Sequence, residues 1–419
     1  MSTRLGDEQR PTARRHSARL VGLVALCATA AGCSVASGGD GGTAPKADSA
    51  GSSASASSSP SATAPPKSVA TVAYNVKQHG VKVDKVVTLT ADHGTFSTVT
   101  VRSAKGGELA GRLSADKTTW TSTARLEPGT RYRVHTVAVD GDGLTSEKRS
   151  SFRTEALTLD QQTYPSFAPV GGETVGIGMP VIVRFDVPVA DRASIERHLK
   201  VTNSSGQKGS WHWLSDSEVH WRPMHYWKPG TDVTVTADIN SIPAGNGVYG
   251  QLSRRSTFHV GDSVISKVNA QTDHMKTYIN GKLARTIPIT TGKAGFTTRS
   301  GIKVIVEKFR HKRMNSETIG IANNSAEGYD LDDVEYAMRV TYSGEFLHAA
   351  PWSVGSQGYA NVSHGCTGMS TSNAAWLYGV SKPGDVVDYT GTDRAMTLDN
   401  GYGDWNESFS EYKKGSALS

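Results

Sequence analysis

The stretch Tyr132-Arg133-Val134-His135-Thr136-Val137 alternates apolar and polar residues, and Val81-Lys82-Val83-Asp84-Lys85-Val86 does the same earlier in the chain. A period of two places successive side chains on opposite faces, which is the pattern of a strand with one buried face. Turns rich in glycine separate such runs throughout residues 69–155. We therefore expect this part of the chain to be a β-sandwich of short antiparallel strands.

A second unit repeats the first with an offset near 101 residues. The matched pairs are Leu126 with Trp227, Pro128 with Pro229, Gly129 with Gly230, Thr130 with Thr231, Tyr132 with Val233, Val134 with Val235, and Trp120 with Trp221. Phe152 near the end of the first unit has a counterpart in Phe258, within a few residues of that offset. The repeat predicts two tandem immunoglobulin-like domains, at residues 69–155 and 156–262.

Aromatic residues and histidines gather in the second unit, and they suggest either a metal or carbohydrate site or ordinary packing. They are Trp211, Trp213, Trp221, Trp227, His212, His220 and His225. Alternating aromatic side chains on sandwich strands are typical of core and inter-domain packing, and no cysteine or carboxylate stands at ligand spacing beside these histidines. We expect packing and no metal site.

The N-terminus has the pattern of an export signal. Five arginines precede an apolar run from Leu20 to Ala31, which is too short to span a bilayer and ends in Ala30-Ala31-Gly32-Cys33. Residues 1–32 are therefore expected to be removed on export, with Cys27 among them. Cys33 fits a bacterial lipobox, with Ala30 in place of the usual leucine, and we expect a lipid anchor on Cys33. The alternative is ordinary cleavage, with Cys33 incidental.

Residues 33–68 are dominated by Ser, Ala, Gly, Thr and Pro, a composition that cannot bury enough apolar surface to fold. They predict a disordered tether that spans about 30 Å as a random coil. The protein is then expected outside the cell, lipid-anchored to the outer face of the cytoplasmic membrane and facing the cell wall. Of the formal net charge of +6, the signal supplies +3, and the mildly basic remainder indicates no nucleic-acid partner.

Residues 263–392 predict a third domain that is mainly β with one short helix. The strand-like runs are Ser263 to Val268, Lys276 to Ile279, Leu283 to Thr290, Gly301 to Lys308, Tyr336 to Val340 and Asp385 to Tyr389. A helix is expected at Thr371 to Tyr378, where Ser370 or Ser372 can cap its start. The aromatic segment 393–419 is expected to be partly ordered, with order fading after about Lys413.

Cys366, in Ser363-His364-Gly365-Cys366, is the only cysteine left once the export segment is set aside. A thiol is mostly protonated at neutral pH and needs an imidazole or a positive dipole to become a nucleophilic thiolate. His348 ends a strand-like segment eighteen residues earlier and can supply a general base. His364 stands two residues before the cysteine. Taken singly, each of these residues has an ordinary structural explanation.

Gly365 allows a sharp backbone turn that points the Gly365 and Cys366 amides at a reacting carbonyl oxygen, so the two amides are a candidate oxyanion hole. The dipole of the expected helix after Cys366 would favour the same charge. Papain-like enzymes place the cysteine before the histidine, and sortases use a Thr-Leu-x-Thr-Cys strand end with a downstream arginine. Neither arrangement is present around Cys366.

The segments Leu347-His348-Ala349-Ala350-Pro351-Trp352 and Asn361-Val362-Ser363-His364-Gly365-Cys366, with their spacing, resemble the active-site motif of YkuD-type L,D-transpeptidases. The resemblance extends through Thr291-Gly292-Lys293, Thr298-Arg299-Ser300-Gly301, the tandem immunoglobulin-like domains and the lipobox. The chain is similar to the actinobacterial lipoprotein L,D-transpeptidases over nearly the whole mature sequence.

The resemblance implies a peptidoglycan cross-linking enzyme. Cys366 would attack the third residue of a donor tetrapeptide stem, expel D-Ala, and pass the acyl group to a side-chain amine of an acceptor stem in a 3→3 cross-link. It assigns His348 as general base, oriented by the Ala349 carbonyl, and His364 as a second motif histidine near the substrate. It assigns the Gly365 and Cys366 amides as the oxyanion hole.

The resemblance also aligns Met314, Tyr329, Ser343 and Trp352 with the lining of the substrate cleft, and residues from about Lys308 to Asp333 with a mobile lid. Two positions depart from the family pattern, since some relatives carry asparagine at Gly368 and an aromatic residue at Ile319. Because of these departures, the sequence leaves open how tightly the site binds the donor stem. Asp332, Asp333 and Asp388 are expected to be solvated rather than catalytic.

Two other functions remain open from the sequence: an L,D-carboxypeptidase that trims tetrapeptide to tripeptide, and a non-catalytic peptidoglycan-binding lipoprotein. The intact Cys366 and His348 pair argues against the binding protein, because a binder needs no thiolate. The mechanism and the resemblance imply that β-lactams, carbapenems above all, acylate Cys366. No metal or organic cofactor is expected, because the sequence contains no ligand cluster and no nucleotide-binding loop.

Overall fold

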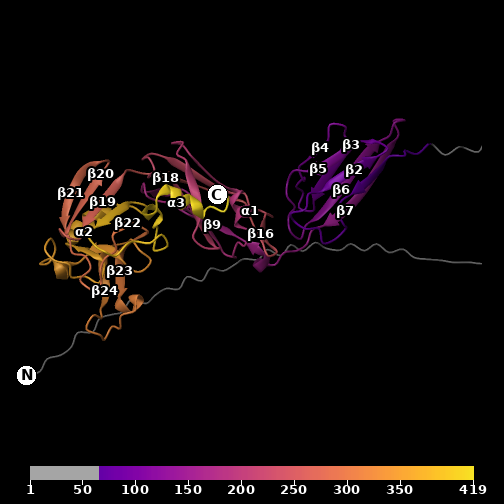
Figure 1. The fold of residues 1–419 in the computed structure, drawn as a ribbon. Helices are drawn as coiled ribbons and strands as arrows, with labels where there is room; N and C mark the ends of the chain where they lie inside the picture. The colour runs from indigo at the N-terminus through magenta and orange to yellow at the C-terminus, as the bar shows by residue number, and fades with distance from the viewer. Residues whose placement is uncertain (1–65) are drawn as a thin grey trace, which may run out of the picture. The chain divides into compact units, whose positions relative to one another are not determined.

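The computed structural model describes residues 66–419, in which strands far outnumber helices (Figure 1). The predicted mainly β fold class is confirmed. The export signal, Cys33 and nearly all of the expected tether lie outside the described residues. Within residues 66–419, no helix is long and apolar enough to cross a membrane.

The first sandwich pairs two antiparallel sheets. One has the order β1-β2-β5-β4 and the other β3-β6-β7. The strands are β1 (Thr71–Tyr74), β2 (Thr88–Asp92), β3 (Thr95–Ser103), β4 (Gly111–Leu113), β5 (Thr119–Ser122), β6 (Arg131–Val139) and β7 (Thr145–Arg153). Alternate residues of β6 are buried, including Tyr132 and Val134, so the period-two pattern does place one face of this strand in the core.

The second sandwich has the sheets β13-β14-β11-β9 and β10-β18-β15-β12, with a small third sheet β16-β17-β8. Its elements are η1 (Leu159–Gln161), β8 (Gln162–Thr163), β9 (Pro165–Ala168), β10 (Thr174–Val175), β11 (Val181–Phe185), α1 (Arg192–Glu196), β12 (Leu199–Asn203), β13 (Gly209–Trp213), β14 (Glu218–Pro223), β15 (Asp232–Ala237), β16 (Pro243–Gly245), β17 (Val248–Gly250) and β18 (Arg254–Val260).

The sequence repeat has a physical basis in both sandwiches. Tyr132 on β6 faces Phe152 on β7, and the repeat-related Val233 on β15 faces Phe258 on β18. Trp120 and Trp221 each cover a glycine on the adjoining strand, where a β-carbon would overlap the indole ring. The repeated positions are therefore those where large side chains fill the core against a small or apolar partner.

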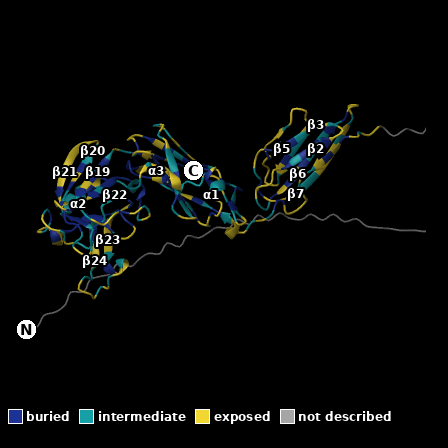
Figure 2. Cartoon of the chain, viewed as in Figure 1, coloured by how far each residue is buried: buried dark blue, intermediate teal, exposed yellow. Residues whose placement is uncertain are grey.

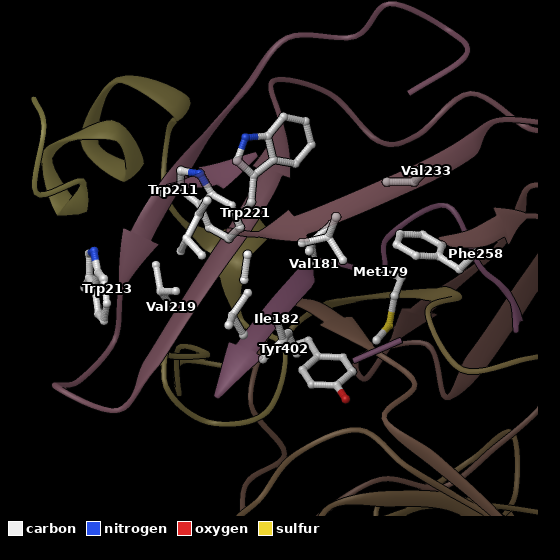
Figure 3. Close-up of a cluster of buried hydrophobic side chains, with 14 of the residues drawn as sticks. Met179, Val181, Ile182, Trp211, Trp213, Val219, Trp221, Val233, Phe258 and Tyr402 are labelled. Carbon is white, nitrogen blue, oxygen red and sulfur yellow. The ribbon is translucent and has the colours of Figure 1, made fainter. Parts of the chain in front are cut away.

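The tryptophans of the second unit lie in its core, as Figure 3 shows for three of them. Trp221 stacks on Trp227 with ring centroids 5.4 Å apart, and the Trp213 indole donates to Glu196 at 2.8 Å. The expectation that no carboxylate stands beside the histidines was wrong. Buried His220 contacts Glu218 Oε1 at 2.7 Å and Asp404 Oδ1 at 2.9 Å, and Asp404 comes from the C-terminal segment, which the local sequence could not indicate.

The third domain contains two sheets, β21-β20-β19-β27-β22 and β23-β24-β25-β26. Its elements are β19 (Val264–Asn269), β20 (His274–Ile279), β21 (Lys282–Pro288), β22 (Gly301–Val304), β23 (Glu307–Asn315), η2 (Ser316–Ile319), β24 (Asp330–Arg339), β25 (Phe346–Ala349), η3 (Pro351–Ser353), β26 (Thr367–Met369), α2 (Thr371–Val380) and β27 (Val386–Thr390). The Ser370 hydroxyl accepts from the Asn373 amide and caps α2. The segment aligned with a lid begins in β23 and ends in β24, and η2 and a connection at residues 320–329 join these two paired strands.

The C-terminal segment packs against the second sandwich through η4 (Asp404–Asn406), α3 (Phe409–Tyr412) and η5 (Lys413–Gly415). Order does not fade after Lys413, because the Ala417 amide still donates to Glu196 at 2.8 Å. Both the second sandwich and the third domain contain buried strands, coloured dark blue in Figure 2. Val181 and Trp227 join Val304, Val386 and Tyr402 in one apolar cluster. The two domains therefore meet through an apolar interface, and the third domain also has a core cluster of its own, which includes Met275, Leu347 and Met369.

Candidate active site

Strands β25 and β26 bring the cysteine and the histidine together. The two strands pair in parallel with His348 opposite Gly368, and Cys366 directly precedes β26. Both side chains line a cavity of about 350 Å³ together with Met314, Tyr329 and Trp352. Residues eighteen positions apart therefore share one site because adjacent strands of one sheet carry them.

The His348 side chain is held as a neutral imidazole. Its ring is buried, and Nδ1 lies 2.7 Å from the Ala349 carbonyl oxygen, an acceptor that requires Nδ1–H and so leaves Nε2 unprotonated. Burial lowers the pKa of His348, more than the carbonyl contact raises it. Trp352 stacks on the imidazole with ring centroids 5.9 Å apart. The Ala349 carbonyl thus takes the place that a carboxylate has in other triads.

The Cys366 thiol is protonated in this state. Burial raises its pKa to about 11, and Sγ donates to the Gly344 carbonyl at 3.6 Å. The Phe346 backbone N–H faces the sulfur and opposes the shift. The expected help from a helix dipole is absent, because β26 separates Cys366 from Thr371, where α2 begins. A helix dipole acts only near the first turn.

Gly365 adopts a backbone conformation with φ of +124°, which side chains with a β-carbon rarely take. Thr298 Oγ1 donates to its carbonyl at 2.8 Å and fixes the turn. The Gly365 amide donates to Ser363 Oγ at 3.1 Å, while that hydroxyl donates to the Cys366 carbonyl at 2.6 Å. The Gly365 amide is therefore already engaged, and it has to leave or share Ser363 before it can stabilise an oxyanion.

His364 lies at the side of the same cavity. Its Nε2 is 2.7 Å from Glu327 Oε2, which Lys293 Nζ also contacts at 2.6 Å. The His364 ring packs edge-on against Phe296 and tilted against Tyr329. Sequence reasoning missed Glu327, because its distance along the chain from His364 gives no signal of contact.

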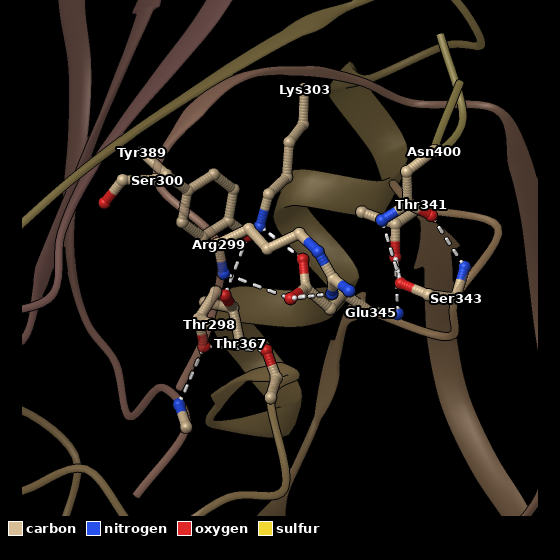
Figure 4. Close-up of polar contacts among 12 residues, drawn as sticks. Thr298, Arg299, Ser300, Lys303, Thr341, Ser343, Glu345, Thr367, Tyr389 and Asn400 are labelled. Atoms are coloured by element: carbon tan, nitrogen blue, oxygen red, sulfur yellow. Dashed lines mark hydrogen bonds and ion pairs between the residues drawn. The ribbon is translucent and has the colours of Figure 1, made fainter. Parts of the chain in front are cut away.

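The four residues aligned with a substrate cleft divide between two cavities that meet at Cys366. Met314 and Tyr329 line both cavities, Trp352 lines the larger one, and Ser343 lines a second cavity of about 240 Å³. Asn400 of the C-terminal segment holds Ser343, donating to its hydroxyl and accepting from its amide, each at 2.9 Å (Figure 4).

A buried ion cluster lies near Cys366, and its pairing could not be read from the sequence. Lys303 Nζ contacts Glu345 Oε2 at 2.5 Å, and Arg299 Nη1 contacts Glu345 Oε1 at 3.1 Å (Figure 4). Lys303 is fully buried, and burial lowers its pKa to about 8 against the opposing effect of Glu345. The available signal was a lysine inside the apolar run Ile302-Lys303-Val304-Ile305, where a charged residue needs a buried partner.

The other acids near the domain have different surroundings. Asp332 is almost fully exposed, and Asp333 pairs with His311 on the hairpin. Among residues 66–419, no group of three or more His, Cys, Asp or Glu side chains is arranged so that it could hold a metal ion. The cavity and its walls contain a thiol, a neutral imidazole and backbone amides, which together suit acyl transfer through a covalent intermediate.

Two protein-family models match this chain. Residues 263–388 match the L,D-transpeptidase catalytic domain, and residues 78–243 match the bacterial Ig domain. The solved structure of LD transpeptidase LdtMt1 in complex with imipenem is 36% identical, with a TM-score of 0.49, and the match covers 55% of this chain and 99% of that one.

Two curated relatives come from Mycobacterium tuberculosis. L,D-transpeptidase 5 is 33% identical over 333 residues, 78% of this chain and 72% of the relative. L,D-transpeptidase 2 is 38% identical over 339 residues, 81% of this chain and 82% of the relative, so the match includes far more than the catalytic motif. The chain therefore belongs to the L,D-transpeptidase family, whose members cross-link peptidoglycan stem peptides.

Proposed function

We propose that this L,D-transpeptidase works as a cysteine acyltransferase, with Cys366 as nucleophile and His348 as general base. The observation that carries the proposal is the fixed tautomer of His348. The Ala349 carbonyl holds Nδ1–H, so Nε2 is free to accept a proton in the cavity that Cys366 lines. A neutral imidazole is the form that a general base requires.

In the first half-reaction, the Cys366 S–H proton passes to His348 Nε2 while Sγ forms a bond to the carbonyl carbon of the third residue of a donor tetrapeptide. The bond to the D-Ala nitrogen breaks, and the leaving amine takes the proton from His348. A thioester and free D-Ala result. The Cys366 amide, joined by the Gly365 amide when it leaves Ser363, stabilises the oxyanion.

In the second half-reaction, the side-chain amine of an acceptor stem attacks the thioester and gives its proton to His348. The C–S bond breaks, the thiol is restored, and a 3→3 cross-link forms. Met314, Tyr329 and Trp352 provide apolar walls for the stems, and Trp352 also steadies the base. Attack by water in place of the amine would give tripeptide, the carboxypeptidase outcome.

Product analysis with a disaccharide-tetrapeptide tests this function, with the Cys366→Ala and His348→Gln variants as controls. We expect D-Ala and a 3→3 dimer from the wild type, and loss of at least about a thousandfold in rate for each variant. Tripeptide without dimer would establish the carboxypeptidase instead. Binding without turnover by the wild type would establish the non-catalytic protein.

We also propose that carbapenems acylate Cys366, because a strained cyclic amide can enter the same site and open on thiol attack. Intact mass should increase by one drug molecule in the wild type and not in Cys366→Ala. An equal increase in both proteins would contradict this assignment.

The proposed location is the outer face of the cytoplasmic membrane, through a diacylglyceryl group on Cys33. The support is the lipobox-like Ala30-Ala31-Gly32-Cys33 after an export signal. The mature protein should partition into detergent, and the Cys33→Ala variant should remain in the aqueous phase. Equal partitioning of the two proteins would contradict the anchor.

A further inference from the structure

The two cavities that meet at Cys366 differ in charge. The larger has no Lys, Arg, Asp or Glu in its lining. The second, which we name the cationic chamber, is lined by Lys312, Arg313, Arg339, Ser343, Gly344 and Cys366 among others, and by no carboxylate residue. The thiol is directed towards this chamber, since Sγ donates to Gly344. An anionic group next to the thiol is therefore favoured on this side.

Arg339 is the cation best placed to bind a ligand there. Arg313 is already engaged by Asp330, through contacts at 2.8 and 2.5 Å. Arg339 has only long contacts, with Nε 3.5 Å from Glu307 Oε2 and Nη1 3.4 Å from the Thr341 carbonyl. Its guanidinium lies over the Phe346 ring at 4.5 Å, and 22% of its side chain is exposed. The side chain is thus steadied while most of its five N–H donors remain free for a carboxylate.

Ser343 adds a neutral donor to the chamber. Asn400 Nδ2 donates to Ser343 Oγ, which fixes the hydroxyl oxygen while leaving its hydrogen free to reach Thr341 or a ligand. A guanidinium fork beside a positioned hydroxyl is a common arrangement for recognising a carboxylate. The chamber therefore has both parts of a carboxylate site.

We propose that Arg339, assisted by Ser343, binds the free terminal carboxylate of the donor stem and so selects donors that end in an amino acid with a free acid. The inference rests on the proposed function and adds a specificity determinant to it. The leaving residue is bonded to the carbonyl that Sγ attacks, so its carboxylate lies within about one residue length, roughly 3.5 Å along the chain, of the scissile bond.

The charge of the chamber also separates the two substrates. An acceptor amine that arrives as an ammonium ion is repelled by Lys312 and Arg339, whereas a donor carboxylate is attracted. Gly368 has no side chain with which to grip the stem. Arg339 and Ser343 supply polar recognition from the other side of the thiol.

Binding to the inactive Cys366→Ala protein tests the proposal without chemistry. The probes are a tetrapeptide stem with a free D-Ala carboxylate and the same stem ending in D-alaninamide, each titrated by calorimetry. We expect the acid to bind at least about tenfold more tightly than the amide, and Arg339→Gln to abolish that preference. Arg310→Gln is the matched control, since Arg310 lies on β23, pairs with Glu335 at 2.8 Å and lines neither cavity.

Equal affinity of the Cys366→Ala protein for the acid and the amide would overturn the assignment. An equal loss of affinity for both probes in Arg339→Gln would also overturn it, because it would show that Arg339 has a structural role only. In the active protein, which retains Cys366, Arg339→Gln should raise KM for the acid donor far more than it lowers kcat. The KM for the amide donor should change by no more than about twofold. Absence of D-Ala release by the wild type would reject the proposed function, while the binding comparison still decides the role of Arg339.

Discussion

The reactive pair is neutral at rest, with a protonated Cys366 thiol and a His348 imidazole whose Nδ1–H is bound to the Ala349 carbonyl. Many cysteine enzymes keep a preformed thiolate beside a histidinium ion. Here burial disfavours the charged form of both groups, because it raises the pKa of the thiol and lowers the pKa of the imidazole. In the proposed mechanism, proton transfer from Cys366 to His348 therefore has to accompany attack on the substrate.

This resting state predicts the pH dependence of alkylation at Cys366. With a thiol pKa of about 11, only on the order of one molecule in ten thousand is a thiolate at pH 7. The rate of iodoacetamide labelling should rise about tenfold per pH unit from pH 7 to pH 10. Labelling that is already maximal near neutrality would show a preformed thiolate and contradict the neutral pair.

The ion cluster behind the nucleophile predicts a different residue-scale effect. Lys303→Met leaves Glu345 buried with only Arg299 as a partner, and breaking a buried pair costs about 3 kcal/mol of unfolding free energy. Lys303→Met combined with Glu345→Leu removes both charges and should regain a large part of that loss. Urea unfolding measures both. A double variant less stable than the single would contradict the pairing.

At the scale of elements, the β23–β24 hairpin shows where sequence reasoning stopped short. Residues 307–313 carry charge on both faces, so the apolar alternation that indicates a strand is missing. Instead of apolar contacts, oppositely charged side chains on the two strands pair with each other, as His311 does with Asp333 and Arg313 with Asp330. Neither partner can be chosen before the register is known, so no strand is predicted from the sequence between residues 309 and 335.

The contact between β14 and η4 predicts a pH-dependent stability. His220 lies between Glu218 and Asp404, and these acids raise its pKa to about 9 although burial alone would lower it. Because the folded value exceeds the unfolded value of 6.5, the His220 contribution is fully present below about pH 6.5 and is lost as the pH rises through 9.

His220→Gln should therefore lower the free energy of unfolding by on the order of 2 kcal/mol near pH 6, and the difference from the wild type should shrink by pH 10. Glu218, whose pKa falls to about 2, contributes above about pH 4.5 and loses its contribution as the pH falls further. Denaturant unfolding between pH 5 and pH 10 checks the trend. A constant difference across this range would contradict the coupling.

At the scale of the whole molecule, the second sandwich and the catalytic domain form one packed unit. The Gly176 and Gly178 amides donate to the Pro383 and Gly384 carbonyls, each at 2.8 Å, and the Trp405 indole donates to the Gly178 carbonyl at 2.7 Å. The first sandwich has its own apolar cluster and joins the second through polar contacts such as Arg125 with Asp238.

This division predicts that calorimetry of residues 66–419 shows two thermal transitions. One is the unfolding of the first sandwich, and the other is the joint unfolding of the second sandwich and the catalytic domain. Gly176→Ala should lower only the second, by about 2 kcal/mol or more, because a β-carbon there would overlap the backbone of Gly384 and Asp385. Gly172→Ala, in open space but with a positive φ, is a control for glycine loss alone. A single transition, or equal effects of both variants, would contradict this division.

Much of the fold could be predicted from the sequence, because the period-two alternation and the 101-residue repeat reflect core positions such as Tyr132 and Val233. The motif likewise named Cys366, His348 and the Ala349 carbonyl, since these depend on neighbouring residues. The partners that the sequence missed, including Glu345 for Lys303 and Asp404 for His220, are joined only by tertiary contact. Charged pairs of this kind leave no periodic signal.

The most direct test of the central claim is rapid-quench intact mass spectrometry with a tetrapeptide donor whose side-chain amine is acetylated, so that no acceptor is present. We expect a thioester adduct whose added mass equals that of the donor less D-Ala, mapped to Cys366 and absent from Cys366→Ala. D-Ala release without an adduct on Cys366, or an adduct on another residue, would contradict it.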